Sequence, residues 1–280
     1  MRTACLLVLF LLALVGPHSA FAQPGSRILA TSGATQLEGS AGGGIVPWAV
    51  ISGYGSDTEI GGSAFYTRVS VDDFDLWSAG VAVGVNNRFE LSVARQHLDV
   101  TPLDLSIEQD IFGAKYRVVG DLIYGALPQV SVGLMHKRNS DMTVPRLLGA
   151  DSDNGTDVYV SASKLWLGAA GGYNVLLNGT LRHTEANQGG LLGFGSADGG
   201  RGELVVEGSA ALFLNHNLAV GLEYRQKPNQ LALKEQDWMD AFVGWFPNKR
   251  VAVVLAYAEL GDIAGLQDQA GWYLSLQLTQ

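Results

Sequence analysis

The chain is built from short segments in which apolar residues alternate with small or polar residues. The last segment shows this most plainly, and its apolar positions are Trp272, Leu274, Leu276 and Leu278. A two-residue period places alternate side chains on opposite faces of a β-strand. We predict about fourteen strands, at residues 28–37, 46–54, 62–71, 76–85, 88–98, 108–119, 128–138, 157–165, 173–183, 203–214, 217–226, 238–246, 250–260 and 271–279. The pattern predicts an all-β protein.

The connections between these strands tend to alternate short with long. Tight turns rich in Asn and Pro occur at 86–87, 215–217 and 247–249, and longer loops occur at 99–107, 139–156, 184–202, 227–237 and 261–270. Bacterial outer-membrane barrels keep short turns on the periplasmic side and long loops outside. The alternation therefore predicts a transmembrane antiparallel up-and-down β-barrel.

The strand count depends on the first part of the chain. If both ends of the barrel chain are periplasmic, the turn parity holds only when the weak segment 28–37 counts as a strand, which favours fourteen strands. The connection at 72–75 is short where a long loop is expected. The alternative is a barrel of twelve strands in which residues 23–45 form an N-terminal plug or hatch.

Seven aromatic residues fall at or near predicted strand ends. They are Trp48, Trp77, Trp166, Tyr173, Trp238, Trp245 and Trp272. Such positions are typical of the aromatic girdles at membrane interfaces. In a soluble β-sandwich, a comparable set would more often lie in mid-strand, within the core.

Residues 1–22 have the features of a secretory signal peptide. Arg2 precedes the apolar stretch Leu6–Val15, and Ala20–Ala22 forms a small-x-small cleavage site. The barrel is then expected over residues 23–280. Cys5 falls inside this leader, so the remaining chain has no cysteine for disulfide or thiolate–metal chemistry.

Composition excludes two other classes of protein. Without Arg2, the chain carries 17 basic against 27 acidic residues, and a net charge of -10 argues against a nucleic-acid partner. The longest apolar run after the leader is Val251–Ala258, far short of the roughly 18 residues that a membrane-spanning helix needs.

Several sequence stretches resemble a known family. They are Gln36–Gly39, Gly42–Ala49, Gly53–Gly55, Phe65–Val69, Glu90–Gln96, Gly190–Gly195, Asn217–Arg225, Trp245–Lys249 and Gly271–Gln277. Together they resemble the domain of unknown function 3034 of Gram-negative bacteria, across nearly the whole chain after the leader. This resemblance implies an outer-membrane β-barrel and supplies no catalytic or ligand-binding residues.

Charged residues on the predicted inward faces are candidates for the lumen lining. They are Arg68, Lys115, Arg117, Arg182, Glu203, Glu207, Glu223 and Arg225. Such charges set which solutes pass a water-filled barrel, although both signs are present and the residues can also pair with one another. We expect the basic residues of strands 62–71 and 108–119 to face the acidic residues of 203–226 across the lumen.

A second set of basic residues lies near the outer ends of the strands, on the faces predicted to contact lipid. It consists of Arg95, His97, His136, Arg138 and His183. Long basic side chains at this depth can reach lipopolysaccharide phosphates, or are simply tolerated at the interface.

We predict no enzymatic activity, no cofactor and no metal site. His97 and Ser92 share one strand, Asp99 lies nearby, and such adjacent residues do not converge on a substrate. The acidic loop 151–157 lacks the spacing of a calcium-binding EF-hand.

The predicted function is a passive or ligand-gated outer-membrane pore for small solutes. Apolar pairs in two external loops, Leu147–Leu148 and Leu191–Leu192, motivate an alternative, a fatty-acid-transporter-like channel for hydrophobic molecules. A non-conducting barrel with a surface-binding or structural role is the third possibility. The expected partners are outer-membrane lipid and lipopolysaccharide, the barrel-assembly machinery and a small solute.

Overall fold

The structure is a computed structural model of the chain. It describes residues 25–196, 199, 202–231 and 235–280. The predicted signal peptide, residues 1–22, lies outside the described residues.

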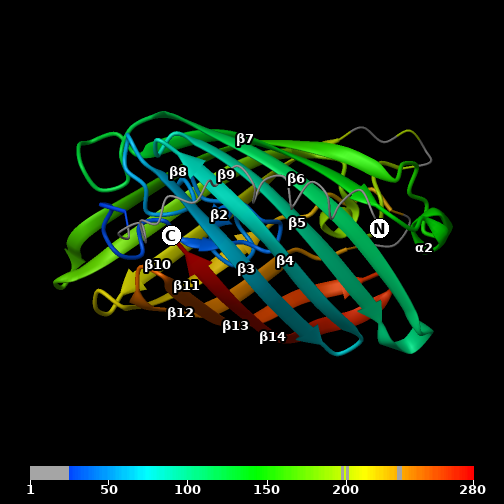
Figure 1. The fold of residues 1–280 in the computed structure, drawn as a ribbon. Helices are drawn as coiled ribbons and strands as arrows, with labels where there is room; N and C mark the ends of the chain where they lie inside the picture. Colours follow the sequence, from blue (N-terminus) through cyan, green and yellow to red (C-terminus); the bar gives the residue numbers. More distant parts are fainter. Residues whose placement is uncertain (1–24, 197–198, 200–201, 232–234) are drawn as a thin grey trace, which may run out of the picture.

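Twelve strands of the described chain form one closed antiparallel barrel (Figure 1). They are β3 (Ile60–Val71), β4 (Phe74–Val85), β5 (Phe89–Val100), β6 (Leu105–Val119), β7 (Gln129–Asn139), β8 (Asn154–Ala170), β9 (Tyr173–Thr184), β10 (Glu203–Phe213), β11 (Leu218–Arg225), β12 (Trp238–Asn248), β13 (Val251–Ile263) and β14 (Leu266–Thr279). Each strand pairs with its neighbour in sequence, and β14 pairs with β3 to close the wall. The predicted β-barrel is confirmed.

The first two predicted strands, 28–37 and 46–54, do not join the wall. Residues 30–55 instead fill the barrel interior, and every one of them is buried. We call this segment the plug. Within it, β1 (Ala34–Thr35) and β2 (Ala41–Gly42) pair as a small hairpin. The twelve-strand alternative is therefore correct and the preferred count of fourteen is wrong. The plug also extends ten residues beyond the predicted 23–45.

The amino-acid sequence explains why residues 30–55 do not form wall strands. The run Gly42–Gly44 and the following Pro47 interrupt any sustained alternation. Glycine weakens a strand, and proline cannot donate a ladder hydrogen bond. The backbone groups of this segment bond partly to one another and partly to polar side chains that project inward from the wall.

The outer face of the barrel is apolar along its strands. On β14, for example, Leu274, Leu276 and Leu278 are about half exposed, whereas Ser275 and Gln277 point inward and are buried. A continuous apolar exterior with alternating inward polar residues suits a wall surrounded by lipid. Within the described residues, no helix is long and apolar enough to cross a membrane.

The two ends of the barrel differ in their connections. At the short-turn end, the strands are joined by residues 86–88, 120–128, 171–172, 214–217 and 249–250. At the long-loop end, they are joined by residues 72–73, 101–104, 140–153, 185–202, 226–237 and 264–265. These loops carry the 3-10 helices η1 (Thr101–Leu103) and η2 (Asn187–Gly190) and the helix α2 (Thr143–Leu147).

One long loop folds into the barrel. Residues 186–194, which we call the inner loop, are buried except for the half-buried Gly189. Leu191 and Leu192 thus point inward, as their apolar character suggested. Leu147 is the exception to this expectation, because it lies on α2 with 83% of its surface exposed.

The plug turn generates a prediction about Gly42. A Cβ atom on Gly42 would lie 2.2 Å from the backbone oxygen of Val46, and neither backbone can yield cheaply. We expect Gly42→Ala to destabilise the plug by about 1–3 kcal/mol, the usual cost of overpacking, while the barrel persists. Limited proteolysis would then cleave within residues 30–55, and the barrel would keep its heat-modifiable mobility in SDS gels.

Gly208→Ala is the matched control, because a Cβ atom there meets only the Asn178 backbone oxygen at 3.6 Å, an ordinary contact. Equal protease resistance of the two variants would contradict the role assigned to Gly42.

Candidate functional site

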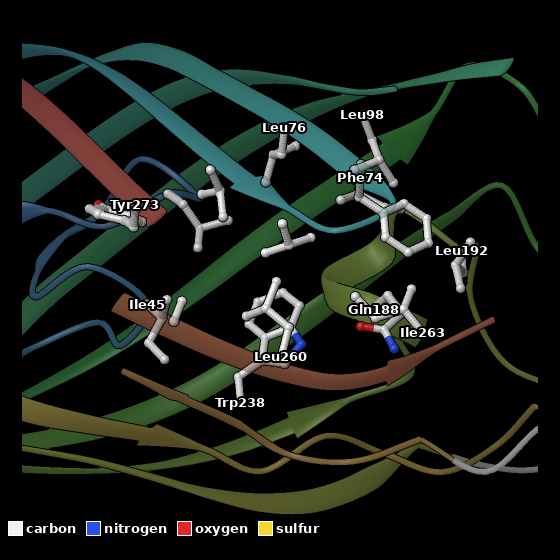
Figure 2. Close-up of a pocket in the computed structure, with 15 residues that line it drawn as sticks. Ile45, Phe74, Leu76, Leu98, Gln188, Leu192, Trp238, Leu260, Ile263 and Tyr273 are labelled. Carbon is white, nitrogen blue, oxygen red and sulfur yellow. The ribbon is translucent and has the colours of Figure 1, made fainter. Parts of the chain in front are cut away.

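An apolar pocket lies inside the barrel on the long-loop side of the plug (Figure 2). Its floor is formed by the plug residues Leu37 and Ile45, and its roof by Gln188, Leu191 and Leu192 of the inner loop. Its wall residues are Val69, Val71, Phe74, Leu76, Leu98, Trp238, Ala258, Leu260, Ile263 and Tyr273. The pocket holds about 590 Å³ of space not filled by atoms, part of it open to solvent.

The pocket arises because the inward faces of the strands change character along the barrel. On β5, Glu90 and Ser92 point inward beside the plug, whereas Leu98 points inward at the long-loop end. On β3, Thr67 gives way to Val69 in the same direction. The interior is thus divided into a polar zone that holds the plug and an apolar zone beyond it.

The plug is held by a buried ion network centred on Glu38. Its Oε1 lies 2.5 Å from Lys137 Nζ and 2.8 Å from Arg225 Nη2, and its Oε2 lies 3.1 Å from Arg182 Nη1. We call these groups, together with Asp157 and Glu207, the Glu38 network.

Charge is balanced within the Glu38 network. Asp157 contacts Lys137 at 2.7 Å and Arg182 at 2.9 Å, and Glu207 contacts Arg182 at 2.6 Å. Three cations thus meet three carboxylates, all of them buried. Lys137 also donates to the backbone oxygen of Gly189, so one ammonium group touches both the plug and the inner loop.

Two further carboxylates of the wall accept hydrogen bonds from backbone N–H groups of the plug. Glu90 accepts hydrogen bonds from the N–H groups of Ala41 and Ser52 and lies 3.2 Å from Lys115 Nζ. Glu223 accepts from the N–H groups of Gly44 and Ile45. Wall side chains therefore satisfy the backbone polar groups that plug burial removes from water.

The structure places most of the predicted lumen charges inside the barrel. Lys115, Arg182, Glu207, Glu223 and Arg225 are buried there. Arg117 lies at the short-turn end, where it donates to Gly120 and contacts Asp121. Glu203 begins β10 at the long-loop end and is half-buried.

The predicted lumen position of Arg68 is wrong. Its side chain lies on the outer face, 62% exposed, and pairs with Asp75 at 2.6 Å. The inward positions of β3 are instead Phe65, Thr67 and Val69. The inward and outward faces of this strand were exchanged in the prediction because we assigned its apolar residues to lipid. These residues instead face the barrel interior, which holds the plug and the apolar pocket.

The predicted pairing across the lumen is also wrong. Lys115 pairs with Glu90 on the adjacent strand, and Arg182 pairs with Glu207 on its own neighbouring strand. The plug occupies the space between opposite walls, so charges there meet plug groups or adjacent strands.

The five predicted outer-rim residues, Arg95, His97, His136, Arg138 and His183, all belong to the outer face of the barrel. Arg95 pairs with Asp110 at 2.7 Å. His97 stacks on Trp77 and contacts Asp99 at 3.0 Å. Their contact with lipopolysaccharide stays a prediction.

Sequence reasoning missed several interior residues. They are Glu38, Glu90, Lys137, Asp157 and Asp240. The alternation could have identified Lys137 as inward-facing, because its neighbours His136 and Arg138 were assigned outward.

Trp48 and Trp238 were assigned to the girdle but are buried inside the barrel. Trp48 donates a hydrogen bond to Ser209, and Trp238 lines the apolar pocket. The described residues contain no group of three or more His, Cys, Asp or Glu side chains suited to a metal ion.

A closed antiparallel barrel with an apolar exterior and an internal plug is an outer-membrane-type β-barrel. The chain matches the family model described as "Protein of unknown function (DUF3034)" over residues 31–277, and it belongs to this family. A comparison with curated protein sequences returned no match.

The chain is similar to several solved structures. The NanC porin is 12% identical with a TM-score of 0.50, covering 79% of this chain and 99% of that chain. The KdgM porin is 11% identical with a TM-score of 0.49, covering 77% and 98%. The COG4313 outer membrane channel from Pseudomonas putida F1 is 13% identical with a TM-score of 0.41, covering 84% and 96%. At these identities, the likeness concerns the fold alone.

The Glu38 network predicts that Glu38→Gln loosens the plug. The substitution leaves three buried cations facing two carboxylates, and breaking a buried ion pair from one side costs about 3–5 kcal/mol. We expect faster hydrogen–deuterium exchange across residues 34–50 of the detergent-solubilised protein. Glu203→Gln is the control, since Glu203 lies at the rim outside the network. Unchanged exchange in Glu38→Gln would show that the network does not hold the plug.

Proposed function

We propose that this protein is a gated outer-membrane channel for small apolar molecules. In this proposal the long-loop end faces outside, as in bacterial barrels generally, and the short-turn end faces the periplasm. The apolar pocket is the external receiving site, and the plug is the gate.

The observation that carries the proposal is the position of the apolar pocket directly on the plug. Leu37 and Ile45 belong to the plug and form the pocket floor. A molecule in the pocket would therefore touch the element that closes the lumen. Such contact is required for a ligand to shift a gate, because a ligand changes an equilibrium only through different interactions with its two states.

The filled lumen favours a gated channel over a permanently open pore. Backbone groups of the plug bond to opposite sides of the wall, with Leu37 accepting from Ser78 and Pro47 accepting from Thr180. The apolar lining of the receiving site favours a hydrophobic solute over a sugar or an ion. These features support the hydrophobic-channel alternative from the sequence analysis, as a ligand-gated device.

The same proposal includes the expected partners. The basic groups of the outer face, such as Arg138, would contact lipopolysaccharide phosphates, and the barrel-assembly machinery would insert the protein. A non-conducting binding barrel would use the same pocket without moving the plug, so transport measurements distinguish the two.

Pocket binding can be tested with the apolar fluorophore N-phenyl-1-naphthylamine and purified protein. We expect its fluorescence to rise on binding, and Ala258→Trp to weaken binding by at least about tenfold, because Ala258 is buried in the pocket wall. Ala258→Leu is a milder variant in case the tryptophan prevents folding. Leu255→Trp on the outer face of the same strand is the control. Equal binding by all these proteins would contradict the proposed site.

Gating can be tested with a disulfide between the plug and the wall. The hydroxyl oxygens of Thr35 and Ser63 lie 3.4 Å apart, and the chain has no other cysteine after residue 5. In proteoliposomes, we expect Thr35→Cys/Ser63→Cys to transport the fluorophore when reduced and to lose transport when oxidised. Equal transport in both states would show that the plug is not the gate. Binding without transport in the reduced state would favour the binding barrel.

A further inference from the structure

The apolar pocket contains two side chains with N–H donors near the inner loop. Gln188 and Trp238 line the pocket and are almost fully buried. Figure 2 shows Gln188 among Phe74, Leu192 and Ile263, with Trp238 beside Leu260. Within the part of the chain that the structure describes, Gln188 Nε2 and Trp238 Nε1 have no hydrogen-bond partner. Two buried donors are thus available at the edge of an apolar site, and buried donors in native proteins are normally paired.

A cation lies beside these donors. Lys227 Nζ donates to Gln188 Oε1 at 3.2 Å and to the Leu260 backbone oxygen at 3.3 Å, and both acceptors belong to pocket-lining residues. The ammonium group also lies 5.6 Å from the centre of the Trp238 ring. Lys227 is buried, and the nearby carboxyl groups of Glu235 and Asp237 act on it. An ammonium group has three donors, so these two bonds leave one available.

Lys227 also lines a second cavity. This small cavity is lined by the cations Arg182, Arg225 and Lys227, by the carboxylate Glu207 and by Trp238, among others. Arg182 and Arg225 are engaged by the Glu38 network, whereas Lys227 is not part of it. Trp238 belongs to both cavities, so the basic side chamber adjoins the apolar pocket.

The acidic neighbours of Lys227 leave its positive charge in place near neutral pH. Burial lowers the pKa of Lys227 to about 8, and the charges of Glu235 and Asp237 oppose that shift. Burial also raises the pKa of Glu235, which favours its neutral form, against the effects of Lys227 and of the Gln188 side chain. The Glu235 carboxyl group therefore lies beside the same two side chains that face the pocket.

We propose that the apolar pocket takes amphipathic molecules with a carboxylate head group. The hydrocarbon part lies against Leu260, Phe74 and the plug, and the carboxylate is held by Lys227 Nζ with Gln188 Nε2 and Trp238 Nε1. This inference rests on the proposed function for the pocket itself and adds the chemistry of the ligand. The carboxylate oxygens would accept hydrogen bonds from Gln188 Nε2 and Trp238 Nε1, and their negative charge would pair with Lys227.

The test compares two displacers of equal chain length, decanoate and decanol, against protein-bound N-phenyl-1-naphthylamine. We expect decanoate to displace the fluorophore at about tenfold lower concentration than decanol, a difference of about 1.4 kcal/mol. Lys227→Met should remove this preference while fluorophore binding persists, which shows that the variant is folded. Gln188→Leu should reduce the preference less, because it removes a neutral donor and leaves the cation.

Arg146→Met is the matched control, because Arg146 is an exposed cation of α2 at the same end of the barrel. Equal displacement by decanoate and decanol in the unmodified protein, or a preference that survives Lys227→Met, overturns the carboxylate inference and leaves the apolar site intact. Failure of the fluorophore to bind overturns the proposed function as well.

The preference for decanoate should also depend on pH. The groups that act on Lys227 are Arg225 of β11, Glu235 and Asp237 of its own loop, and Asp262 of β13. Decanoate stays ionised above pH 7, whereas Lys227 loses its charge as the pH rises through about 8. We therefore expect the preference for decanoate to fall between pH 7 and about 9.5, with decanol displacement unchanged. A flat profile for both displacers would exclude Lys227 as the head-group ligand.

Discussion

The structure depends on keeping a buried polypeptide segment fully hydrogen-bonded inside a barrel. Residues 30–55 bring backbone N–H and C=O groups and one carboxylate, Glu38, out of water. Burial of that carboxylate is tolerable only because Lys137, Arg182 and Arg225 surround it, with Asp157 and Glu207 restoring neutrality. Such a network contributes little net stability compared with apolar packing, but a plug displaced from this position would leave its charges unpaired. The network therefore specifies where the plug sits more than it stabilises the barrel.

That constraint divides the interior of the barrel. Around the plug, inward side chains such as Glu90 and Ser131 must be polar, because they bond to its backbone. Beyond the plug, the strands that line the apolar pocket point Leu98 and Leu260 inward instead. The apolar pocket is thus a consequence of where the plug ends. Its polar edge lies where the inner loop meets Lys227, and Lys137 joins that loop to the plug through Gly189.

Much of the wall could be predicted from the sequence. Alternation along strands such as β9 and β14 located the strands, and it placed Arg182 and Glu207 inside the barrel. It failed for Arg68, because the rule that apolar residues face lipid assumes a uniformly polar lumen. It failed for Trp238 for the same reason, since an aromatic residue near a strand end fits either a girdle or an apolar interior. The first segments were misassigned to the wall because a short alternating stretch is compatible with both a strand and a buried plug.

The sequence by itself determined the class of fold and the two faces of most strands. A two-residue period and the tendency of short turns to alternate with long loops are local properties, and they hold whatever fills the barrel. Tertiary structure decided where the N-terminal segment lies, which charges meet at Glu38 and which residues surround the apolar pocket. These depend on contacts between residues far apart in sequence, such as Glu38 with Arg225 and Gln188 with Lys227. Local periodicity carries no information about such contacts, because it describes the direction of a side chain and not the partner that it meets.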